Sequence, residues 1–207
     1  MQDTGPAFSF VIPYYKFYGI WCIIILNDRK LGDTMLETNR LMIRKMTKED
    51  APFVLSILNT DYANKYNATE NVNEAIIWKM IEQTISYVII LKNIKEPIGI
   101  IGVERDYLRY NMKSVSMTYF IHKDFSGYGY MTEALKEVIY DIFTRLDRKI
   151  ISLRISKENE RSIKLAKRLS FHYDGMIRMG TRKEDGTIYD DLLYSLTKND
   201  FEENIEI

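Results

Sequence analysis

The segment from Asp124 to Thr132 combines residue types that can bind a phosphate group. It holds Gly127 and Gly129, and it lies between a strand-like pattern and an amphipathic, helix-like pattern. Glycines let backbone N–H groups approach a ligand closely, and the amino end of the following helix carries a partial positive charge. The segment therefore predicts a cradle for a pyrophosphate group, with an ordinary strand-to-helix turn as the alternative interpretation.

The spacing of these glycines excludes two common phosphate-binding motifs. No Gly-Lys-Ser/Thr sequence follows, so the segment is not a Walker loop. Neither a third glycine nor an acidic residue about 20 positions later completes a Rossmann fingerprint. A different phosphate-containing ligand is therefore expected. The positions predicted to hold it are Ser126, Gly127, Tyr128, Gly129, Tyr130, Met131 and Thr132.

The elements that must position this segment alternate between strand-like and helix-like patterns from Leu36 onward, which is typical of an α/β or mixed α+β domain. Apolar alternation or continuous apolar runs predict strands near 41–43 and over 87–91, 97–103, 114–121, 150–155, 171–179 and 188–196. Apolar residues at helical spacing predict helices after Thr47 and over 71–84, 131–146 and 162–169. Turns are expected at Glu96-Pro97 and Asp185-Gly186.

The composition is that of a folded globular protein. Of the 207 residues, 46% are hydrophobic and 28% are charged, which disfavours disordered, collagen-like and coiled-coil classes. Lys plus Arg (29) balances Asp plus Glu (29), so the net charge that attracts nucleic acid or anionic membranes is missing. Cys22 has no partner for a disulfide, and His122 and His172 lack metal-ligand spacing. We therefore expect a reducing, cytoplasmic compartment, no metal and no nucleic-acid partner.

The first 34 residues differ from the rest of the chain. Phe8 to Leu26 is almost entirely apolar and nearly long enough for a membrane helix of about 20 residues, but Pro13 and Lys16 interrupt it. A secretory signal is not supported, because no Ala-x-Ala site follows. Since Gly32-Asp33 can be encoded by a purine-rich ribosome-binding sequence ahead of the Met35 codon, a misassigned start is favoured over a membrane anchor. We divide the chain into an extension, residues 1–34, and one domain, residues 35–207.

Several further motifs accompany the glycine segment. They are Glu74-Ala75 with Trp78, Thr132-Glu133-Ala134-Leu135, Asn159-Glu160-Arg161-Ser162, Leu169-Ser170-Phe171 and Tyr189-Asp190-Asp191. With them, the chain from about Leu36 to Phe201 resembles the GNAT superfamily of acyl-CoA-dependent N-acetyltransferases, whose loop reads Gln/Arg-x-x-Gly-x-Gly/Ala before a long helix. The first two motifs are similar to the branch that acetylates ribosomal-protein amino termini.

The resemblance implies a mixed α/β (α+β) GNAT fold. In this fold a mostly antiparallel, twisted central sheet of about seven strands is flanked by helices, and two strands splay apart at the acyl-CoA site. Two residues depart from the family pattern. Asp124 stands where the family has Gln or Arg, and an acid there would repel a pyrophosphate. Ser170 replaces a helix-ending glycine, so we expect a strained cap that costs ~1 kcal/mol.

The resemblance also implies which groups bind acetyl-CoA as the cosubstrate. The strand ahead of the loop would offer main-chain N–H groups of Tyr119, Phe120 and Ile121 to the thioester and the pantetheine arm. Asn159 stands where a helix N-cap is expected, and its amide could serve as the cap or reach the cofactor arm.

A proton source for the departing thiolate is implied in the same way. Ser162 matches the position proposed in the ribosomal-alanine branch to protonate or hydrogen-bond the sulfur, with an unremarkable helix-surface serine as the alternative. The polyamine-acetylating relatives place a tyrosine four residues farther on, where this chain has Ala166. Ser162 is therefore the first candidate, and Tyr173 is the second.

The general base cannot be the residue that the ribosomal-alanine branch uses. The glutamate of that branch would fall near Thr181, which cannot accept a proton. Glu104, at the end of a predicted strand, is the better carboxylate and would act through water, with Asp106 as the second candidate. A solvated glutamate without a role is the alternative interpretation.

These observations predict an enzyme that moves acetyl from acetyl-CoA to a primary amine by direct attack in a ternary complex. The acceptor that the resemblance favours is a protein N-terminal amine, such as that of a ribosomal protein, with a polyamine or other small amine as the alternative. Tyr62, Tyr66 and Tyr107 are candidates to line the acceptor cleft. A non-catalytic acyl-CoA sensor, a membrane-tethered enzyme and a homodimer also stay open.

Overall fold

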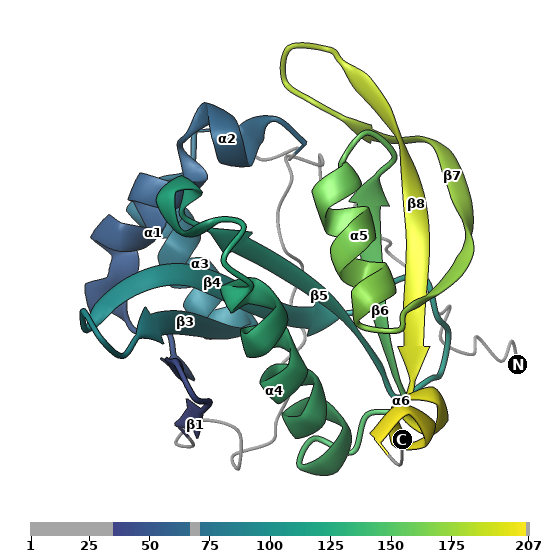
Figure 1. Cartoon of the computed structure of the whole chain (residues 1–207). Coiled ribbons are helices and arrows are strands. Elements are labelled where there is room, and N and C mark those ends of the chain that lie inside the picture. The colour runs from purple at the N-terminus through teal and green to yellow at the C-terminus, as the bar shows by residue number, and fades with distance from the viewer. Residues whose placement is uncertain (1–34, 67–70, 206–207) are drawn as a thin grey trace, which may run out of the picture.

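The computed structural model describes residues 35–66 and 71–205. Their strands form one open sheet of eight strands in the order β1-β2-β3-β4-β5-β6-β8-β7 (Figure 1). The strands are β1 (Leu36–Glu37), β2 (Leu41–Lys45), β3 (Ile85–Leu91), β4 (Glu96–Arg105), β5 (Ser114–Ile121), β6 (Ile150–Ser156), β7 (His172–Arg182) and β8 (Ile188–Thr197). The helices are α1 (Ala51–Leu58), α2 (Asp61–Asn64), α3 (Glu74–Gln83), α4 (Tyr130–Thr144), α5 (Glu160–Arg168) and α6 (Lys198–Ile205). The expectations for the apolar run and the start at Met35 concern residues 1–34 and lie outside the described ranges.

The predicted mixed α/β fold is confirmed, with one strand more than the expected seven. The additional strand, β1, has two residues, which is too short to show an alternating pattern. The expected turn at Glu96-Pro97 is wrong, because these residues begin β4 and pair with Leu91 and Ile90. Residues 92–95 make the turn instead, and Lys95 has a φ of 59° there. The turn at Asp185-Gly186 joins β7 to β8 as predicted.

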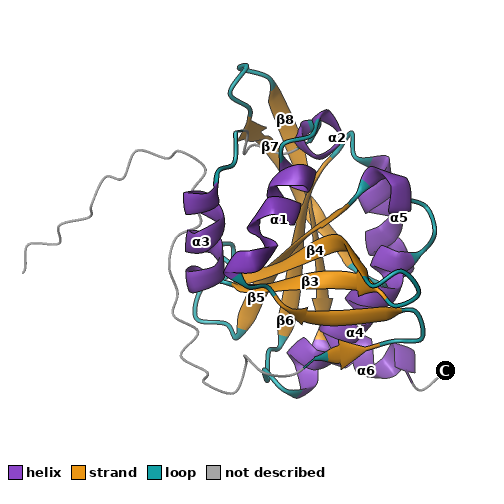
Figure 2. Cartoon of the chain, turned by 90° about the vertical axis from the view of Figure 1, so that its left-hand side faces the viewer, coloured by secondary structure: helices purple, strands orange, loops and turns teal. Residues whose placement is uncertain are grey.

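The helices cover the two faces of the sheet in pairs. Helices α4 and α5 lie on the face toward the viewer in Figure 1, and α1 and α3 lie on the other face, which Figure 2 turns into view. The core under α4 and α5 includes Val115 and Met117 of β5, with Tyr119 and Ile121 packed against it. The core under α1 and α3 includes Ile100, with Phe120 packed against it. Alternate residues of β5 therefore face opposite layers, as period-two geometry requires.

Helix α4 is held on the sheet by a continuous apolar stripe. Its buried side chains recur at helical spacing, and they are Met131, Ala134, Leu135, Val138, Ile139, Ile142 and Phe143. Full burial of a large apolar side chain contributes roughly 1.5–3 kcal/mol, so this stripe fixes where the amino end of α4 lies. The structure places that end directly after the glycine segment.

Helix α5 ends as expected at a strained residue. Ser170 has a φ of 61°, in the left-handed region that favours glycine. The Phe171 N–H donates to the Ala166 carbonyl at 3.0 Å and the Ser170 N–H donates to the Lys167 carbonyl at 3.1 Å, so these two carbonyls near the end of the helix are satisfied. The chain therefore reverses into β7 without losing these bonds.

No helix in residues 35–66 and 71–205 has both the length and the apolar character needed to span a membrane.

Candidate active site

A gap between β5 and β6 divides the sheet. These two strands are parallel and pair only where Ser114–Ser116 meets Ile150–Ser152. Strand β5 continues to Ile121 and β6 continues to Ser156 without further pairing between them. The predicted splay of two strands ahead of the glycine loop is therefore present, and the gap leaves backbone groups that need another partner.

The register of β5 decides which of its backbone groups face the gap. His122 donates its N–H to the Ile98 carbonyl at 2.8 Å, and Phe120 is paired with Ile100 two residues earlier. Because hydrogen-bonded and non-hydrogen-bonded pairs alternate in an antiparallel ladder, the N–H of Phe120 points to β4. The main-chain groups of Tyr119 and Ile121 point to the gap. The expectation for an available Phe120 N–H is therefore wrong, and the reason is this alternation.

The glycine segment forms an open turn into the amino end of α4. Gly127 has a φ of 91° and Gly129 a φ of 83°, conformations that side chains rarely adopt. A Cβ at Gly127 would meet no atom within 4 Å, so one side of the loop is open to a ligand. Gly129 is the N-cap and has no side chain to cap the helix. The first helical bond runs from Glu133 N–H to the Gly129 carbonyl, which leaves the amides of Tyr130, Met131 and Thr132 ahead of the ladder.

These features fit a diphosphate. Unbonded amides at the start of a helix of 15 residues point outward and bring a partial positive charge with them. The side chains of Ser126 and Tyr128 leave the loop open to a diphosphate. Tyr128 is 64% exposed, and the Ser126 hydroxyl accepts a hydrogen bond from Tyr62 of α2. The Asp124 carboxylate is 79% exposed and lies 3.8 Å from His122 Nδ1.

Three arginines surround this loop, and they come from distant parts of the sequence. Arg40 donates from Nη1 to the Tyr128 carbonyl at 3.2 Å, and its guanidinium carbon lies 4.4 Å from the centre of the Tyr130 ring. Arg168 of α5 reaches the Thr132 hydroxyl at 3.4 Å. Arg161 reaches the Tyr62 hydroxyl at 3.0 Å. These three side chains bring positive charge to the loop and to the first turn of α4.

Arg40 also neutralises the acid in the first turn of α4. Its Nε lies 2.7 Å from Glu133 Oε2, and Thr38 donates to Glu133 Oε1 at 2.6 Å. Burial opposes ionisation, but the hydrogen bonds from Thr38 and Arg40 hold the pKa of Glu133 below its ordinary value. Glu133 is therefore a carboxylate next to the proposed diphosphate, and its charge is compensated by Arg40.

Replacing Arg40 with methionine is expected to weaken coenzyme A binding about tenfold. The substitution leaves the Glu133 carboxylate uncompensated near the ligand, a loss of ~1.4 kcal/mol in binding free energy. Calorimetry with coenzyme A measures the effect, and the double variant with Glu133→Gln should recover most of the affinity. Arg44→Met is the matched control, because Arg44 is a nearby arginine on β2 that pairs with Asp50 instead. Equal affinity of Arg40→Met and wild type would contradict this role.

Helix α5 places its amino end at the gap. Asn159 is the N-cap, and its Oδ1 accepts the Ser162 N–H at 3.2 Å. Of the two roles expected for Asn159, the cap is the one that the contacts support. Ser162 lies one turn before Ala166, which is fully buried. The Ser162 hydroxyl lies near the phenol of Tyr119, whose pKa is raised by burial to about 12 in spite of a lowering effect of Ser162.

Glu104 is a partly buried carboxylate on the opposite face of the sheet. It pairs with Ser116 across β4 and β5, on the face covered by α1 and α3. Within the described chain, its carboxylate makes no hydrogen bond or ion pair, and burial raises its pKa to about 7 from an ordinary 4.5. A carboxylate with a pKa near neutrality can accept a proton and release it again under physiological conditions.

The second candidate for the base, Asp106, and the second candidate for the proton source, Tyr173, are placed differently from Glu104 and Ser162. Asp106 has a side chain that is 1% exposed, and it accepts bonds from Arg109 at 2.9 Å, from Ser152 at 2.6 Å and from the Leu108 N–H at 2.9 Å. Its carboxylate is therefore committed to structure. Tyr173 lies on β7, at the edge of the sheet, with β8 and β6 between it and the gap. The structure therefore does not bring Tyr173 to Ser162.

The raised pKa of Glu104 predicts a pH-dependent stability. Below pH 4.5 the carboxyl is protonated in the folded and the unfolded chain, and above about 7 it is ionised in both. Between these values only the folded chain keeps the proton, so rising pH costs the folded state about 3 kcal/mol in total. Relative to wild type, Glu104→Gln should therefore gain stability from about pH 5 to about pH 7, and the difference should level off above pH 7.

Urea unfolding at several pH values measures this difference. Glu96→Gln, at an exposed position of the same strand, should follow the wild-type pH dependence. Parallel curves for Glu104→Gln and wild type would show that Glu104 is solvated in the folded protein.

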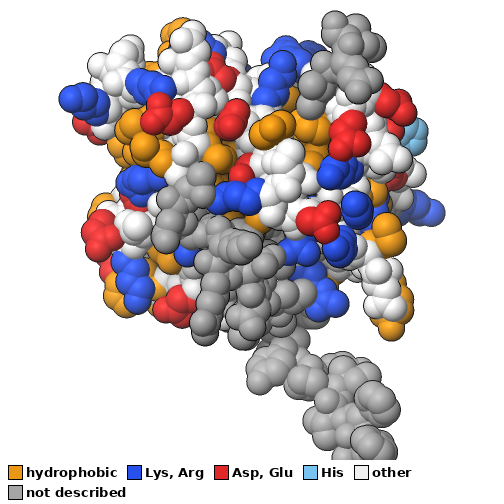
Figure 3. Space-filling view, turned by 90° about the horizontal axis from the view of Figure 1, so that it is seen from below, with side chains coloured by type: hydrophobic (Ala, Val, Ile, Leu, Met, Phe, Trp, Pro, Cys, Tyr) orange, Lys and Arg blue, Asp and Glu red, His pale blue; other side chains and the backbone are white. Residues whose placement is uncertain are grey.

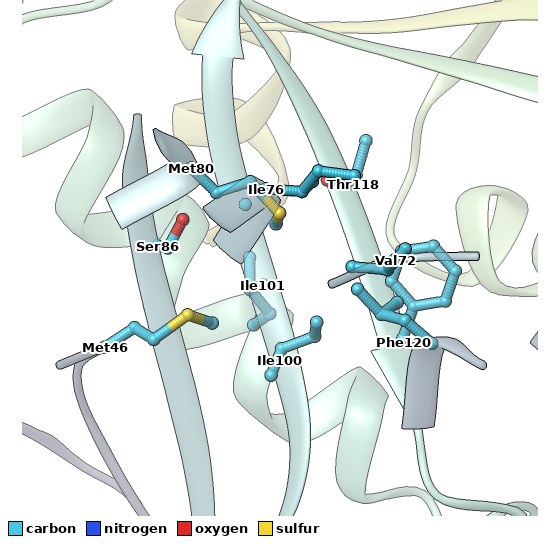
Figure 4. Close-up of a pocket in the computed structure, with 11 residues that line it drawn as sticks. Met46, Val72, Ile76, Met80, Ser86, Ile100, Ile101, Thr118 and Phe120 are labelled. Carbon is cyan, nitrogen blue, oxygen red and sulfur yellow. The ribbon is translucent and has the colours of Figure 1, made fainter. Parts of the chain in front are cut away.

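An apolar pocket lies on the same face as Glu104, between the sheet and the helices α1 and α3 (Figure 4). Two of the side chains that line it are polar, Ser86 on β3 and Thr118 on β5. The remaining side chains that line it are Met46, Leu58, Val72, Ile76, Met80, Ile100, Ile101 and Phe120. On β4 the pocket extends to Gly102, two residues before Glu104, so this face offers a hydrophobic surface on the same strand as the carboxylate.

Helix α2 and the residues that follow it contact both the glycine loop and strand β8. Tyr62 donates to the Ser126 hydroxyl at 2.9 Å, which ties α2 to the glycine loop. Tyr66 packs edge-on against Tyr189 of β8, with 6.4 Å between ring centres, and the Tyr189 hydroxyl donates to the Lys65 carbonyl at 3.3 Å. Tyr62 therefore contacts the glycine loop and Tyr66 contacts β8, but neither lines the apolar pocket, and Tyr107 is 60% exposed in the turn after β4.

Sequence reasoning did not identify the three arginines around the loop, or the side chain of Tyr119. Arg40 lies 88 positions before Tyr128, so no local motif joins them. On the face that Figure 3 shows, Lys and Arg side chains are interspersed with Asp and Glu side chains. Within the described ranges no group of three or more potential metal-ligating side chains occurs.

Comparisons with known proteins agree with this geometry. The curated relatives include the uncharacterized N-acetyltransferases YoaA of Bacillus subtilis, 27% identical over 79% of this chain and 97% of that protein, and p20 of Bacillus licheniformis, 29% identical over 80% and 97%. The fold resembles a ribosomal-protein-S5-alanine acetyltransferase from Vibrio fischeri, with a TM-score of 0.69, 18% identity and coverage of 82% of this chain and 99% of that chain. It also resembles Mycobacterium smegmatis RimJ in complex with CoA-disulfide, with a TM-score of 0.66, 18% identity and coverage of 77% and 82%.

The sequence profile of the acetyltransferase (GNAT) domain matches residues 40–172, from the arginine beside the loop to the start of β7. This match includes the divided strands, the glycine loop, α4 and α5. Because it spans more than half of the chain, the protein belongs to the GNAT acetyltransferase family.

Proposed function

We propose that this protein transfers the acetyl group of acetyl-CoA to the N-terminal amine of a protein, by direct attack in a ternary complex. The observation that carries the proposal is the gap between β5 and β6, with the glycine loop at its end and Glu104 on the opposite face. Acetyl-CoA supplies the activated acetyl group. The chain supplies the binding surface on one side of the sheet and the proton acceptor on the other.

Binding would use the amides at the start of α4 for the diphosphate, and the main-chain groups of Tyr119 and Ile121 for the pantetheine arm. Ser162 would lie beside the sulfur, at the α5 end of the gap. The open space at Gly127 and the unpaired strand edge support this placement, because both offer donors that lack a protein partner.

The amine would enter from the face of α1 and α3. A primary amine is protonated at neutral pH, and it must lose one proton before it attacks and another afterwards. Glu104 would accept one of these protons through water, which its pKa of about 7 permits, and the other would pass to solvent. The apolar pocket beside it would hold an uncharged side chain of the acceptor.

Two structural neighbours support a protein N-terminal amine as the acceptor. One is the ribosomal-protein-S5-alanine acetyltransferase, and the other is RimL, a ribosomal L7/L12 alpha-N-protein acetyltransferase, with a TM-score of 0.67 and 16% identity over 79% of this chain and 94% of that chain. The cytoplasm, where ribosomal proteins are made, is the compartment that we propose with this acceptor.

Release of free thiol from acetyl-CoA tests the proposal against a panel of amines. Peptides with a free amino terminus should be acetylated, and mass spectrometry should place the acetyl group on the terminal nitrogen. The same peptides with a blocked terminus and an internal lysine are the control. Turnover with polyamines alone would instead support the small-amine alternative, and coenzyme A binding without any turnover would support the sensor.

A further inference from the structure

The phenol of Tyr119 is a buried polar group without a hydrogen-bond partner in the described part of the chain. Buried tyrosine hydroxyls nearly always have a partner, because an unpaired one loses its bond to water and gains nothing in return. The free protein therefore keeps a donor that destabilises its fold. Such a group is expected where a ligand supplies the missing acceptor.

The position of Tyr119 identifies that ligand. Tyr119 lies three residues beyond Ser116, the last residue of β5 that pairs with β6, so it borders the gap. Its side chain packs on the α4 and α5 face, in the same cluster as Ile163 of α5. Its backbone faces the gap itself. The side chain and the backbone of Tyr119 therefore both border the space assigned to the acyl-CoA arm.

Ser162 lies close to the same phenol. Burial raises the pKa of Tyr119, and the Ser162 hydroxyl partly offsets that rise. The two hydroxyls are neighbours, yet the phenol has no bond that meets hydrogen-bond geometry. One turn farther along α5, the fully buried Ala166 offers no polar group. Strand β5 therefore places the Tyr119 phenol beside the Ser162 hydroxyl of α5.

We propose that the Tyr119 hydroxyl donates a hydrogen bond to the sulfur of coenzyme A as the thioester breaks, beside Ser162. This inference rests on the proposed function. During transfer, the N–C bond forms, the C–S bond breaks, and the electron pair of the C–S bond moves to sulfur. The attacking amine loses a proton to Glu104 through water, Glu104 returns that proton to solvent, and the thiolate takes up a proton from solvent upon release.

The phenol acts as a hydrogen-bond donor and keeps its proton. Its pKa of about 12 lies above the value of about 8.5 typical of a thiol, so full transfer to the thiolate would be unfavourable. A donor aimed at the atom where charge develops stabilises the transition state more than the ground state. Tyr119 should therefore affect kcat more than the binding of acetyl-CoA.

Tyr119→Phe removes only the hydroxyl and tests this role. We expect kcat to fall about 10- to 100-fold, while KM for acetyl-CoA changes less than about threefold. Calorimetry should show that wild type binds coenzyme A more tightly than desulfo-coenzyme A, and that the variant loses this preference. Without ligand, the variant should be at least as stable as wild type to heat, because the hydroxyl that it loses has no partner.

Tyr87→Phe is the matched control. Tyr87 is a buried tyrosine of β3 whose hydroxyl donates to Asp141 at 3.5 Å, so this variant should lose stability and keep kcat. An unchanged kcat together with an unchanged preference for coenzyme A in Tyr119→Phe would overturn the inference. If wild type binds coenzyme A and acetylates peptides in the same experiments, that result would leave the proposed function intact. Failure of wild type to bind coenzyme A would instead remove the proposed function.

Discussion

Replacing Glu104 with glutamine should lower kcat for acetyl transfer by about 10²–10⁴-fold, the range that a general base contributes. Glutamine keeps the size and polarity of the side chain but cannot accept a proton. The wild-type kcat/KM should rise with pH and level off above about 7, where the carboxylate is ionised, since burial raises its pKa to that value. The variant should lack this rise. Initial rates of thiol release from about pH 5.5 to 9 measure both effects.

Asp106→Asn separates the two carboxylates. Asp106 is held by Arg109 and Ser152, so its substitution should lower stability and leave the pH dependence of kcat/KM as in wild type. Wild-type activity in Glu104→Gln would remove Glu104 from the mechanism. A loss of the pH dependence in Asp106→Asn alone would transfer the role of base to Asp106.

Replacing Gly127 with alanine should weaken coenzyme A binding by about 10- to 100-fold, because a methyl group would occupy the space through which a phosphate approaches the backbone. Gly127 has a φ of 91°, and no atom lies within 4 Å of an added Cβ. The free protein can therefore hold the methyl group without a clash, and the penalty appears when the ligand binds. Calorimetry with coenzyme A measures the loss.

Gly186→Ala provides a closely matched control. Gly186 has a φ of 88° and equally open surroundings, but it lies in the turn between β7 and β8. Both variants should lose a similar stability, roughly 1–2 kcal/mol, because both force a side chain into the left-handed region. Only Gly127→Ala should lose affinity for coenzyme A. Equal affinities in the two variants would show that the diphosphate does not contact this loop.

The spans of the elements near the site follow closely from local patterns. The alternation over 114–121 predicts β5 with the bounds that the structure has, and the apolar stripe of α4 predicts the helix to within a few residues. Two glycines before an amphipathic helix predict the open loop. These signals are short in range, since backbone conformation and the period of apolar residues depend on neighbours in the chain.

Local sequence patterns predict the roles of single side chains less well. Glu104 and Asp106 are two residues apart and are the first and second candidates for the base in the sequence, but only the structure shows that the Glu104 carboxylate has no partner in the described chain while Asp106 accepts three bonds. Tyr173 is the second candidate for the proton source in the sequence, but strand order sets it at the edge of the sheet. Partners and strand order depend on residues far away in the chain, and no local spacing reveals them.

The sequence by itself determined the family, the strand and helix pattern and the glycine loop, because each depends on the types and spacing of residues that are close together in the chain. Only the tertiary structure decided that Tyr119 and Ile121 face the gap while Phe120 pairs with β4, and that Arg40, Arg161 and Arg168 gather around the loop. The physical reason is that a strand turns alternate residues in opposite directions, and the register with its neighbours settles which of them meet the ligand.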